Sequence, residues 1–368
     1  MNDVEAVIKT DAGDLFALTE ALVGVPSVSG DERALANAVE HRLRERAPSL
    51  AVDRIANNVV ARTQGLSTRR VVFAGHLDTV PAAGNAIPRV DGDVLWGLGS
   101  ADMKGGLAVL LALAEQVSRE APRFDATFVF YEGEEVADEH NGLRMIFADA
   151  PELAAGDLAI LLEPTGGWVE AGCQGTIHLR ATWRGARAHS ARPWMGSNAI
   201  HRMAPTLSRL AAFDAGTVDV EGLEFRESLQ VVRIEGGVAN NVVPDVASLI
   251  VNRRYAPARS VEAEIDDVRA LLGDADEVEV RSASPAAAPN LQSPLVAEFV
   301  GTLDLAVRPK LGWTDVARFA AAGVPALNFG PGDPQLAHTA EERVARDDVE
   351  GCARVLAHFL GLRNGAAR

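Results

Sequence analysis

The sequence predicts an α/β fold with a mixed, largely parallel sheet that carries helices on both faces, together with an inserted α+β domain. Three observations predict it. Short apolar runs alternate with helical patterns in the first half of the chain, as in the βαβ units of parallel sheets. After about Gly172 the strand patterns become longer and change their order, which suits antiparallel pairing. The 368 residues exceed the usual size of one domain, so two domains are expected.

Composition excludes several classes of protein. Hydrophobic residues make up 48% of the chain and charged residues 23%, which excludes a disordered, collagenous or small disulfide-stapled protein. With 35 basic and 51 acidic residues the net charge is −16, so nucleic acid is not expected as a partner. Cys173 and Cys352 form no CxxC pattern and suggest no thiolate zinc site. Without a long apolar run or a signal-like start, the chain is expected to be cytoplasmic and free of the membrane.

The first domain is expected over residues 1–173. A helix at 15–22 precedes a second helix that ends near Arg46, and an S-x-x-E capping box at Ser29–Glu32 would begin this second helix. Strands then alternate with helices, with strands at 71–74, 126–130 and 158–162 and helices at 105–116 and 143–148. In such sheets functional residues gather at the carboxyl ends of strands, which is where the polar clusters of this sequence fall.

The inserted domain is expected over residues 174–285. Its predicted elements are strands at 176–184, 229–234 and 247–255 and helices at 198–211 and 261–272. An Ala-, Ser- and Pro-rich stretch at 282–289 would link back to the first domain. The second part of that domain, 286–368, is expected to contain a helix at 314–322, a strand at 326–329 and a helix at 349–360.

Two polar clusters lie next to predicted strands or helices and have both a functional and a plain interpretation. His76 and Asp78 follow the first strand, where the carboxylate could orient a metal-bound imidazole. A solvated histidine near a turn is the alternative. Asp102 lies among glycines just before a helix and could simply cap it. The number of glycines goes beyond a cap and suggests close backbone approach or unusual φ values.

The remaining clusters add carboxylates and a second imidazole. Glu134 and Glu135 follow a buried strand, and adjacent carboxylates there repel each other unless a cation or a raised pKa relieves them. One could bind a metal ion while its neighbour faces a substrate. Glu163 ends the third strand, and His338 lies after the last one. A set of carboxylates and imidazoles without thiolates suits a pair of zinc ions, or cobalt or manganese.

The segments GHLDTVP, WGLGSADMKGG, EGEE, LLEPT and AHTAEE, in this order, resemble the di-zinc amidohydrolase and peptidase family. That family includes aminoacylases, glutamate carboxypeptidases, acetylornithine deacetylases and succinyl-diaminopimelate desuccinylases. The resemblance implies a zinc-exopeptidase-like catalytic domain with two Zn²⁺ per subunit, which Co²⁺ or Mn²⁺ may replace. His76 and Glu163 would hold one ion and Glu135 and His338 the other. Asp102 would bridge both, and a cis peptide would follow it.

Two further residues of the catalytic domain receive roles from the same resemblance. Asp78 would orient His76 without binding metal itself. Glu134 would be the general base that takes a proton from the bridging water and passes it to the leaving amine.

The resemblance also implies that the insert is a dimerisation and lid domain, so that the enzyme would be a homodimer. His189 would act as an oxyanion donor in the partner subunit's site; an exposed basic hairpin is the structural alternative. Asn241 and Arg254 match positions where the insert meets a substrate carboxylate, and Gly330 is expected to bind substrate as well.

Within the family, the segments GWTDVARF and NFGPG look most like the desuccinylases of high-G+C bacteria. Their substrate is N-succinyl-LL-2,6-diaminopimelate, which is cleaved to succinate and LL-2,6-diaminopimelate for lysine and diaminopimelate biosynthesis. Acetylornithine deacetylase, or another amidohydrolase or dipeptidase acting on an N-acyl amino acid, is the alternative. A non-catalytic binding relative is an alternative of another class, but such a protein should have lost Glu134 or metal ligands, and all are present.

Overall fold

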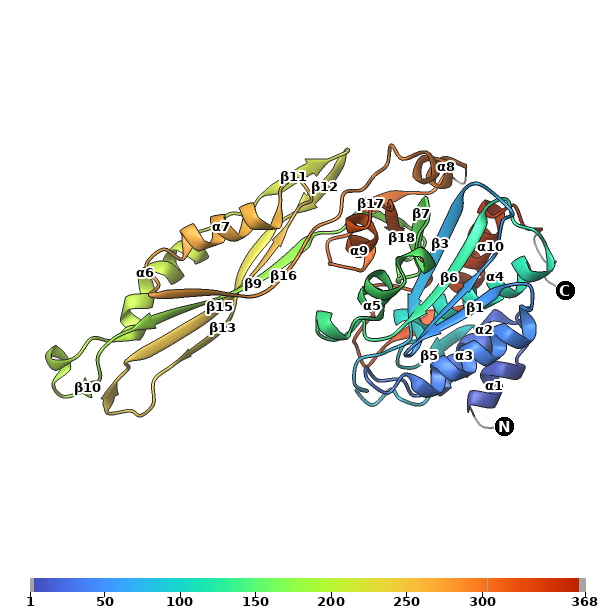
Figure 1. Cartoon of the computed structure of the whole chain (residues 1–368). Helices are drawn as coiled ribbons and strands as arrows, with labels where there is room; N and C mark the ends of the chain where they lie inside the picture. The colour runs from blue at the N-terminus through green and yellow to red at the C-terminus, as the bar shows by residue number, and fades with distance from the viewer. Residues whose placement is uncertain (1–2, 303, 364–368) are drawn as a thin grey trace. The chain divides into compact units, whose positions relative to one another are not determined.

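The computed structural model describes residues 3–302 and 304–363 (Figure 1). The chain forms two compact units. The first takes the described residues of 1–171, 290–308 and 318–368, and the second takes 172–289 and 309–317. The segment 309–317, which the sequence assigned to the returning part of the first domain, therefore belongs to the second unit.

An eight-stranded sheet forms the centre of the first unit, in the order β1-β2-β6-β3-β7-β18-β8-β17. The inner strands β6, β3, β7 and β18 are parallel to one another, while β2 joins β6 and β8 joins β18 in antiparallel fashion. The strands are β1 (Ala51–Ile55), β2 (Asn58–Arg62), β3 (Arg70–His76), β6 (Asp125–Tyr131), β7 (Leu158–Leu161), β8 (Val169–Ala171), β17 (Val307–Pro309) and β18 (Ala326–Asn328).

Helices cover both faces of this sheet. In Figure 1, α2, α3, α4 and α10 lie together on one side, and α5 and α9 lie on the other. Because both faces are covered, every residue of β6 and β7 is buried, and these strands are apolar runs without alternation. The helices are α1 (Asp3–Lys9), α2 (Leu15–Gly24), α3 (Arg33–Arg46), α4 (Gly105–Arg119), α5 (Gly142–Asp149), α8 (Pro294–Thr302), α9 (Val316–Ala321) and α10 (Arg346–Phe359). The predicted α/β class is confirmed.

The second unit is an antiparallel sheet with helices on one face. Its four strands are ordered β13-β15-β9-β16. Buried and partly exposed residues alternate along β9, so that Ile177, Leu179 and Trp183 join a separate core with Met203 of α6 and Val268 of α7. The elements are β9 (Gly175–Arg184), β13 (Ser228–Gly236), β15 (Val246–Tyr255), β16 (Glu277–Ser284), α6 (Ala199–Ala211) and α7 (Val261–Leu271).

Smaller strand pairs complete both units. In the second unit β10 pairs with β14 and β11 pairs with β12, and in the first unit β5 lies between β4 and β19. These strands are β10 (Ala188–His189), β14 (Val242–Val243), β11 (Thr217–Val220), β12 (Leu223–Arg226), β4 (Arg89–Asp91), β5 (Val94–Trp96) and β19 (Arg343–Ala345). Among the described residues, no helix has the length and apolar character needed to cross a membrane.

The capping box predicted at Ser29–Glu32 is wrong. Helix α3 begins at Arg33, and no side chain caps its first turn. The hydroxyl of Ser29 instead donates to the carboxylate of Asp78 at 2.7 Å. The Glu32 carboxylate accepts from the N–H of Gly30 at 2.9 Å. The hydrogen bond from the Ser29 hydroxyl to the buried carboxylate of Asp78 is charge-assisted, and it orients the Ser29 side chain toward Asp78 instead of the start of α3.

The linker predicted at 282–289 is also shorter than expected. Residues 282–284 are the last of β16, and their backbone pairs with 176–178 of β9. Cross-strand pairing decides the conformation here, although Ser and Ala have little intrinsic preference for strands.

Candidate metal centre

The five predicted metal ligands all belong to the first unit, and four of them follow the parallel strands. His76 is the last residue of β3, Glu135 follows β6 by four residues, and Glu163 follows β7 by two. His338 lies in the loop after β18, and Asp102 lies in the turn before α4. Because these strands are parallel, their carboxyl ends meet at one edge of the sheet and bring the side chains together.

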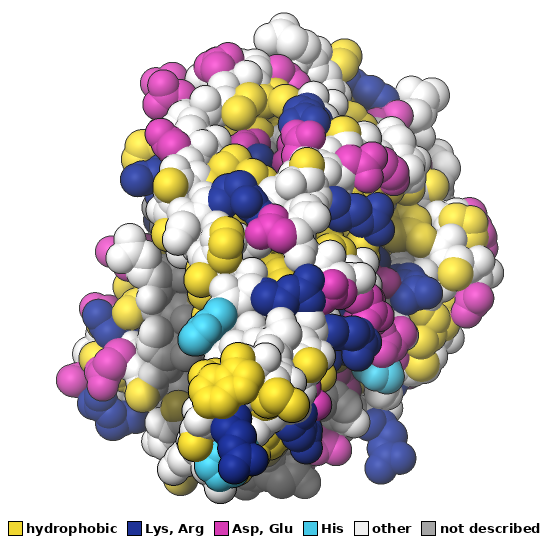
Figure 2. All heavy atoms as spheres, turned by 90° about the vertical axis from the view of Figure 1, so that its left-hand side faces the viewer, with side chains coloured by type: hydrophobic (Ala, Val, Ile, Leu, Met, Phe, Trp, Pro, Cys, Tyr) yellow, Lys and Arg dark blue, Asp and Glu magenta, His cyan; other side chains and the backbone are white. Residues whose placement is uncertain are grey.

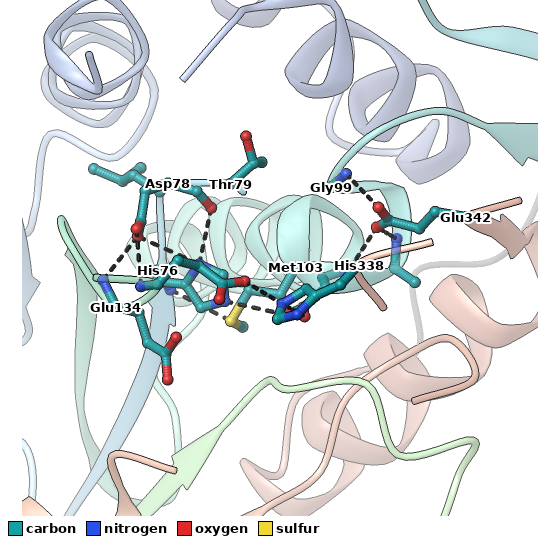
Figure 3. A network of polar contacts seen from close by, with 12 residues as sticks. His76, Asp78, Thr79, Gly99, Met103, Glu134, His338 and Glu342 are labelled. Carbon is teal, nitrogen blue, oxygen red and sulfur yellow. Dashed lines mark hydrogen bonds and ion pairs between the residues drawn. The ribbon is translucent and has the colours of Figure 1, made fainter. Parts of the chain in front are cut away.

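Asp102 is at the centre of this group, with one oxygen toward each of the two imidazoles, His76 and His338, which Figure 3 labels. Its Oδ1 lies 3.2 Å from Nε2 of His76, and its Oδ2 lies 3.4 Å from Nε2 of His338. The same nitrogen of His338 lies 2.7 Å from Oε1 of Glu135. Ligand atoms of His76, Asp102 and Glu135 all lie within 4.8 Å of one another. The two oxygens of Asp102 are thus placed as a carboxylate that bridges two cations requires.

The carboxylates of this group raise the pKa values of both histidines. Burial alone would lower the pKa of His76, but its hydrogen bonds with Asp102 and Asp78 and the negative charge of Glu163 raise the pKa well above its usual value. Hydrogen bonds with Asp102 and Glu135 raise the pKa of His338 to about 10. The carboxylates therefore create a strongly negative site. Carboxylates and imidazoles without a thiolate are donors suited to zinc and similar divalent ions, so the residues present fit a metal pair.

Asp78 is fully buried and contacts both His76 and the backbone of Glu134 and Glu135. Its backbone carbonyl lies 3.0 Å from Nδ1 of His76 and its Oδ1 lies 3.5 Å from the same atom. Nδ1 therefore carries the proton, and Nε2 faces Asp102. The Asp78 carboxylate also accepts the backbone N–H groups of Glu134 and Glu135, each at 3.0 Å. Burial would raise the pKa of Asp78, but the hydrogen bond and charge of His76 lower it to about 2.

Glu134 and Glu135 send their side chains to different places. Glu135 reaches His338, whereas Figure 3 shows the carboxylate of Glu134 turned away from that of Asp78. Glu134 is half-buried. The carboxylates of these two neighbours thus point in different directions, and that of Glu135 points toward His338.

The turn that carries Asp102 matches two expectations from the sequence. The peptide bond between Asp102 and Met103 is cis, as the resemblance implied. Gly99 has a φ of 77°, in the left-handed region that favours glycine. A Cβ on this residue would also lie 2.8 Å from a side-chain carbon of Thr79. The glycines here allow both an unusual backbone conformation and close packing, which goes beyond the needs of a helix cap.

Glu342 is a buried residue of this site that sequence reasoning missed. Its carboxylate accepts the backbone N–H groups of Gly99, Ala101 and Asp102 at 3.0–3.1 Å. The only signal in the sequence is its place as the last residue of AHTAEE, and nothing there distinguishes it from the exposed Glu341.

Gly330, predicted to bind substrate, has a packing role in the structure. It is buried, and a Cβ on it would overlap the carbonyl oxygen of Leu162. Its N–H donates to Oγ1 of Thr165 at 3.3 Å, and its carbonyl accepts from the same hydroxyl at 3.1 Å. Because Gly330 has no Cβ, the chain just after β18 can approach the backbone of Leu162 and Glu163 closely.

The other three predicted residues belong to the second unit. His189 is exposed on β10, and its Nδ1 accepts the N–H of Ala191 at 3.0 Å, so that Nε2 carries the proton and can donate. Asn241 lies beside it, since its backbone carbonyl accepts the N–H of Ser190 at 2.9 Å and the next residue, Val242, pairs with His189. Figure 2 looks onto this end of the unit, where apolar, basic and histidine side chains gather on the surface.

Arg254 lies at the opposite end of the second unit's sheet. It pairs with Thr176 at the start of β9, whereas Val246, near the His189 hairpin, pairs with Arg184 at the end of β9. Eight residues of β15 separate these two points, which corresponds to ~26 Å at about 3.3 Å per residue. The structure therefore brings His189 and Asn241 together and keeps Arg254 apart from them.

Comparison with known proteins decides the family. The model of peptidase family M20/M25/M40 matches residues 72–361. The chain belongs to this family. An M20 protein from Mycobacterium tuberculosis that is named as a succinyl-diaminopimelate desuccinylase, DapE, is 46% identical over 350 residues, which cover 95% of this chain and 98% of the relative. The succinyl-diaminopimelate desuccinylase of Corynebacterium glutamicum is 44% identical over 355 residues, covering 95% and 96%. Both organisms are high-G+C actinobacteria, which agrees with the branch of the family predicted from the sequence.

Solved structures of M20 enzymes share the fold at lower identity. A tripeptidase from Staphylococcus aureus has a TM-score of 0.77 at 21% identity and covers 95% of this chain and 98% of its own. A dinuclear metal-binding M20 peptidase from Bacillus subtilis has a TM-score of 0.72 at 15% identity and covers 95% and 97%. The zinc-exopeptidase-like architecture predicted from the sequence is confirmed by these likenesses.

Proposed function

We propose that this M20 protein hydrolyses N-succinyl-LL-2,6-diaminopimelate to succinate and LL-2,6-diaminopimelate. The observation that carries the proposal is the 44% and 46% identity, over 95% of the chain, to two relatives named for this activity. The cluster of His76, Asp102 and Glu135 supports it, because a non-catalytic relative would have no need to keep metal-ligating side chains together.

We propose two zinc ions at the metal centre, one held by His76 and Glu163 and the other by Glu135 and His338, with Asp102 between them. The direction of the two Asp102 oxygens, one toward each imidazole, supports this division. When bound, such a pair supplies an acidified water and stabilises the charge that develops on the amide oxygen. Cobalt or manganese would suit the same donors.

The chain's own residues then divide the proton chemistry between them. Glu134 takes a proton from the attacking water and delivers it to the leaving amine, since its carboxylate is not turned into the ligand group as that of Glu135 is. Asp78 holds the His76 ring and, through two backbone N–H groups, the turn on which Glu134 sits.

The carboxylates of the substrate require positively charged or amide partners. Arg254 is suited to one of them, because among the described residues no carboxylate forms an ion pair with its half-buried guanidinium. Asn241 offers an exposed amide beside His189. Gly330 is proposed to act indirectly, by supporting Glu163, since its own N–H and carbonyl are both bonded to Thr165.

We propose a homodimer in which His189 and Asn241 serve the partner's site. A separation of ~26 Å along β15 is too long for one small substrate to contact both ends of the same sheet. The edge strand β13 supports dimerisation, because it exposes Val232 (58%) and Ile234 (54%) together with unpaired backbone groups.

A substrate panel tests the proposed reaction. Zinc-loaded enzyme should show its highest kcat/KM with N-succinyl-LL-2,6-diaminopimelate, compared with N-acetylornithine and simple dipeptides. A higher kcat/KM for N-acetylornithine or for a dipeptide would overturn the substrate. Zinc binding without turnover of any of the compounds would favour a binding relative.

A further inference from the structure

The carboxylate of Glu342 holds the backbone N–H of a proposed metal ligand, Asp102, and the backbone just before it. Its Oε2 accepts the N–H of Gly99 at 3.0 Å, and its Oε1 accepts those of Ala101 and Asp102 at 3.1 and 3.0 Å (Figure 3). The side chain is only 1% exposed. A charged carboxylate in such a position needs strong donors, and all three come from the turn that carries Asp102.

Glu342 also connects this turn to the segment of chain that carries His338. Glu342 lies four residues after His338, and its backbone carbonyl accepts the N–H of Gly97 at 3.1 Å. The strand that begins directly after it, β19, pairs with β5, which ends just before Gly97. One short segment therefore carries the ligand His338 and also clamps the backbone of the ligand Asp102.

A buried lysine contributes to the environment of this clamp. Lys104 is 2% exposed, and its Nζ donates to the carbonyl of Val25 at 2.7 Å. Burial lowers the pKa of Lys104 to about 7, although the negative charge of Glu342 opposes this shift. Burial raises the pKa of Glu342, but the backbone N–H groups of Asp102, Gly99 and Ala101 donate to its ionised carboxylate and oppose that shift. Its oxygens can accept hydrogen bonds from the turn but cannot donate any.

We propose that Glu342 is a positioning residue of the metal centre. Its carboxylate fixes the 99–102 turn so that one oxygen of Asp102 faces His76 and the other faces His338. The proposal rests on the assignment of Asp102 as a metal ligand. Residues that orient a ligand in this way typically contribute 10–100-fold to metal affinity.

A merely structural role is the competing explanation, and the chain offers a matched control for it. Asp125 is likewise a buried carboxylate that holds a loop, accepting the hydroxyl of Thr63 at 2.6 Å and the N–H groups of Leu66 and Ser67 at 3.3 and 3.4 Å. It begins β6, at the opposite end of that strand from Glu135. Loss of Asp125 should lower stability without changing metal binding.

Cobalt titration of the full-length apo-enzyme tests the proposal. The variants are Glu342→Gln, Asp125→Asn and the exposed neighbour Glu341→Gln, and the readouts are the Co²⁺ dissociation constant and the visible absorption spectrum of the bound ion, whose shape depends on ligand geometry. The Gln side chain keeps one acceptor but turns an N–H₂ group toward backbone donors. Glu342→Gln should therefore weaken Co²⁺ binding about 10–100-fold and alter the spectrum. Both control variants should keep the wild-type affinity and spectrum.

The possible outcomes separate this inference from the proposed function. Wild-type affinity and spectrum in Glu342→Gln would overturn the positioning role and leave the metal centre standing. An equal loss of affinity in Asp125→Asn would also overturn it, because the effect would then follow from stability. A wild-type protein that binds no Co²⁺ would overturn the metal centre itself. If Glu342→Gln does not fold, Glu342→Asp, whose carboxylate is too short to reach all three donors, is measured with the same expectations.

Discussion

Glu134 and Glu135 are neighbours in the chain but have different surroundings, because Asp78 fixes the backbone between them. Two N–H groups donate to one buried carboxylate, which sets the turn, and the following side chains then point to different partners. A general base needs a carboxylate that is not bound to a metal ion, whereas a metal ligand is a carboxylate that is bound to one. The proposed division of roles within this pair therefore depends on a residue that lies more than fifty positions earlier in the sequence.

Glu134→Ala should separate catalysis from metal binding. We expect kcat to fall ~10²–10⁴-fold, the usual contribution of a general base, while zinc content and folding stay close to wild type. Glu135→Ala is the matched control and should lose zinc. Steady-state kinetics and metal analysis of both variants check this. Loss of zinc in Glu134→Ala would mean that the roles of the two residues are reversed.

Gly330→Ala tests whether this glycine supports Glu163 or contacts substrate. The added Cβ would overlap the backbone oxygen of Leu162, so we expect the free energy of unfolding to fall by about 1–3 kcal/mol, as for other overpacked sites. Gly301→Ala is the control, because a Cβ there meets nothing within 4 Å. Denaturant titrations give both values. Unchanged stability with a raised KM would instead indicate direct contact with substrate.

At the scale of elements, strands with both faces buried were the easiest to predict. β3, β6 and β7 are continuous apolar runs, and predicted metal ligands lie at or just after their ends because parallel strands end at one edge. Short strands such as β8 and the edge strand β17 were missed, since three residues carry no periodic pattern. Glu342 was missed for another reason. Its importance comes from three backbone N–H groups about 240 residues earlier, and no local pattern records them.

The edge strand β13 leads to a prediction about assembly. If it lies in a dimer interface, Val232→Asp combined with Ile234→Asp should give a monomer, because two charges would be buried against the partner. Zinc content should not change, since every proposed ligand belongs to the first unit. Leu311→Asp, another exposed apolar residue of the second unit (49%), is the control and should leave the mass unchanged. Light scattering after size exclusion measures the masses, and a wild-type monomer would contradict the prediction.

At the scale of the whole molecule, the proposed dimer in which His189 serves the partner's site leads to a prediction about mixed subunits. His189→Ala should lower kcat more than it raises KM, because an oxyanion donor acts mainly in the transition state. Mixing this variant with Glu134→Ala should partly restore activity after subunit exchange. The mixed dimer has one site with both defects and one site with neither. Absence of recovery after exchange is confirmed would show that His189 serves its own chain or none.

The central claim is that a pair of divalent ions in this chain drives desuccinylation, and one titration tests it most directly. Metal-free enzyme is titrated with Zn²⁺ while succinate released from N-succinyl-LL-2,6-diaminopimelate is measured against metal bound per chain. We predict no activity without metal and full activity once both sites formed around Asp102 are filled. Full activity in the metal-free protein would contradict the claim.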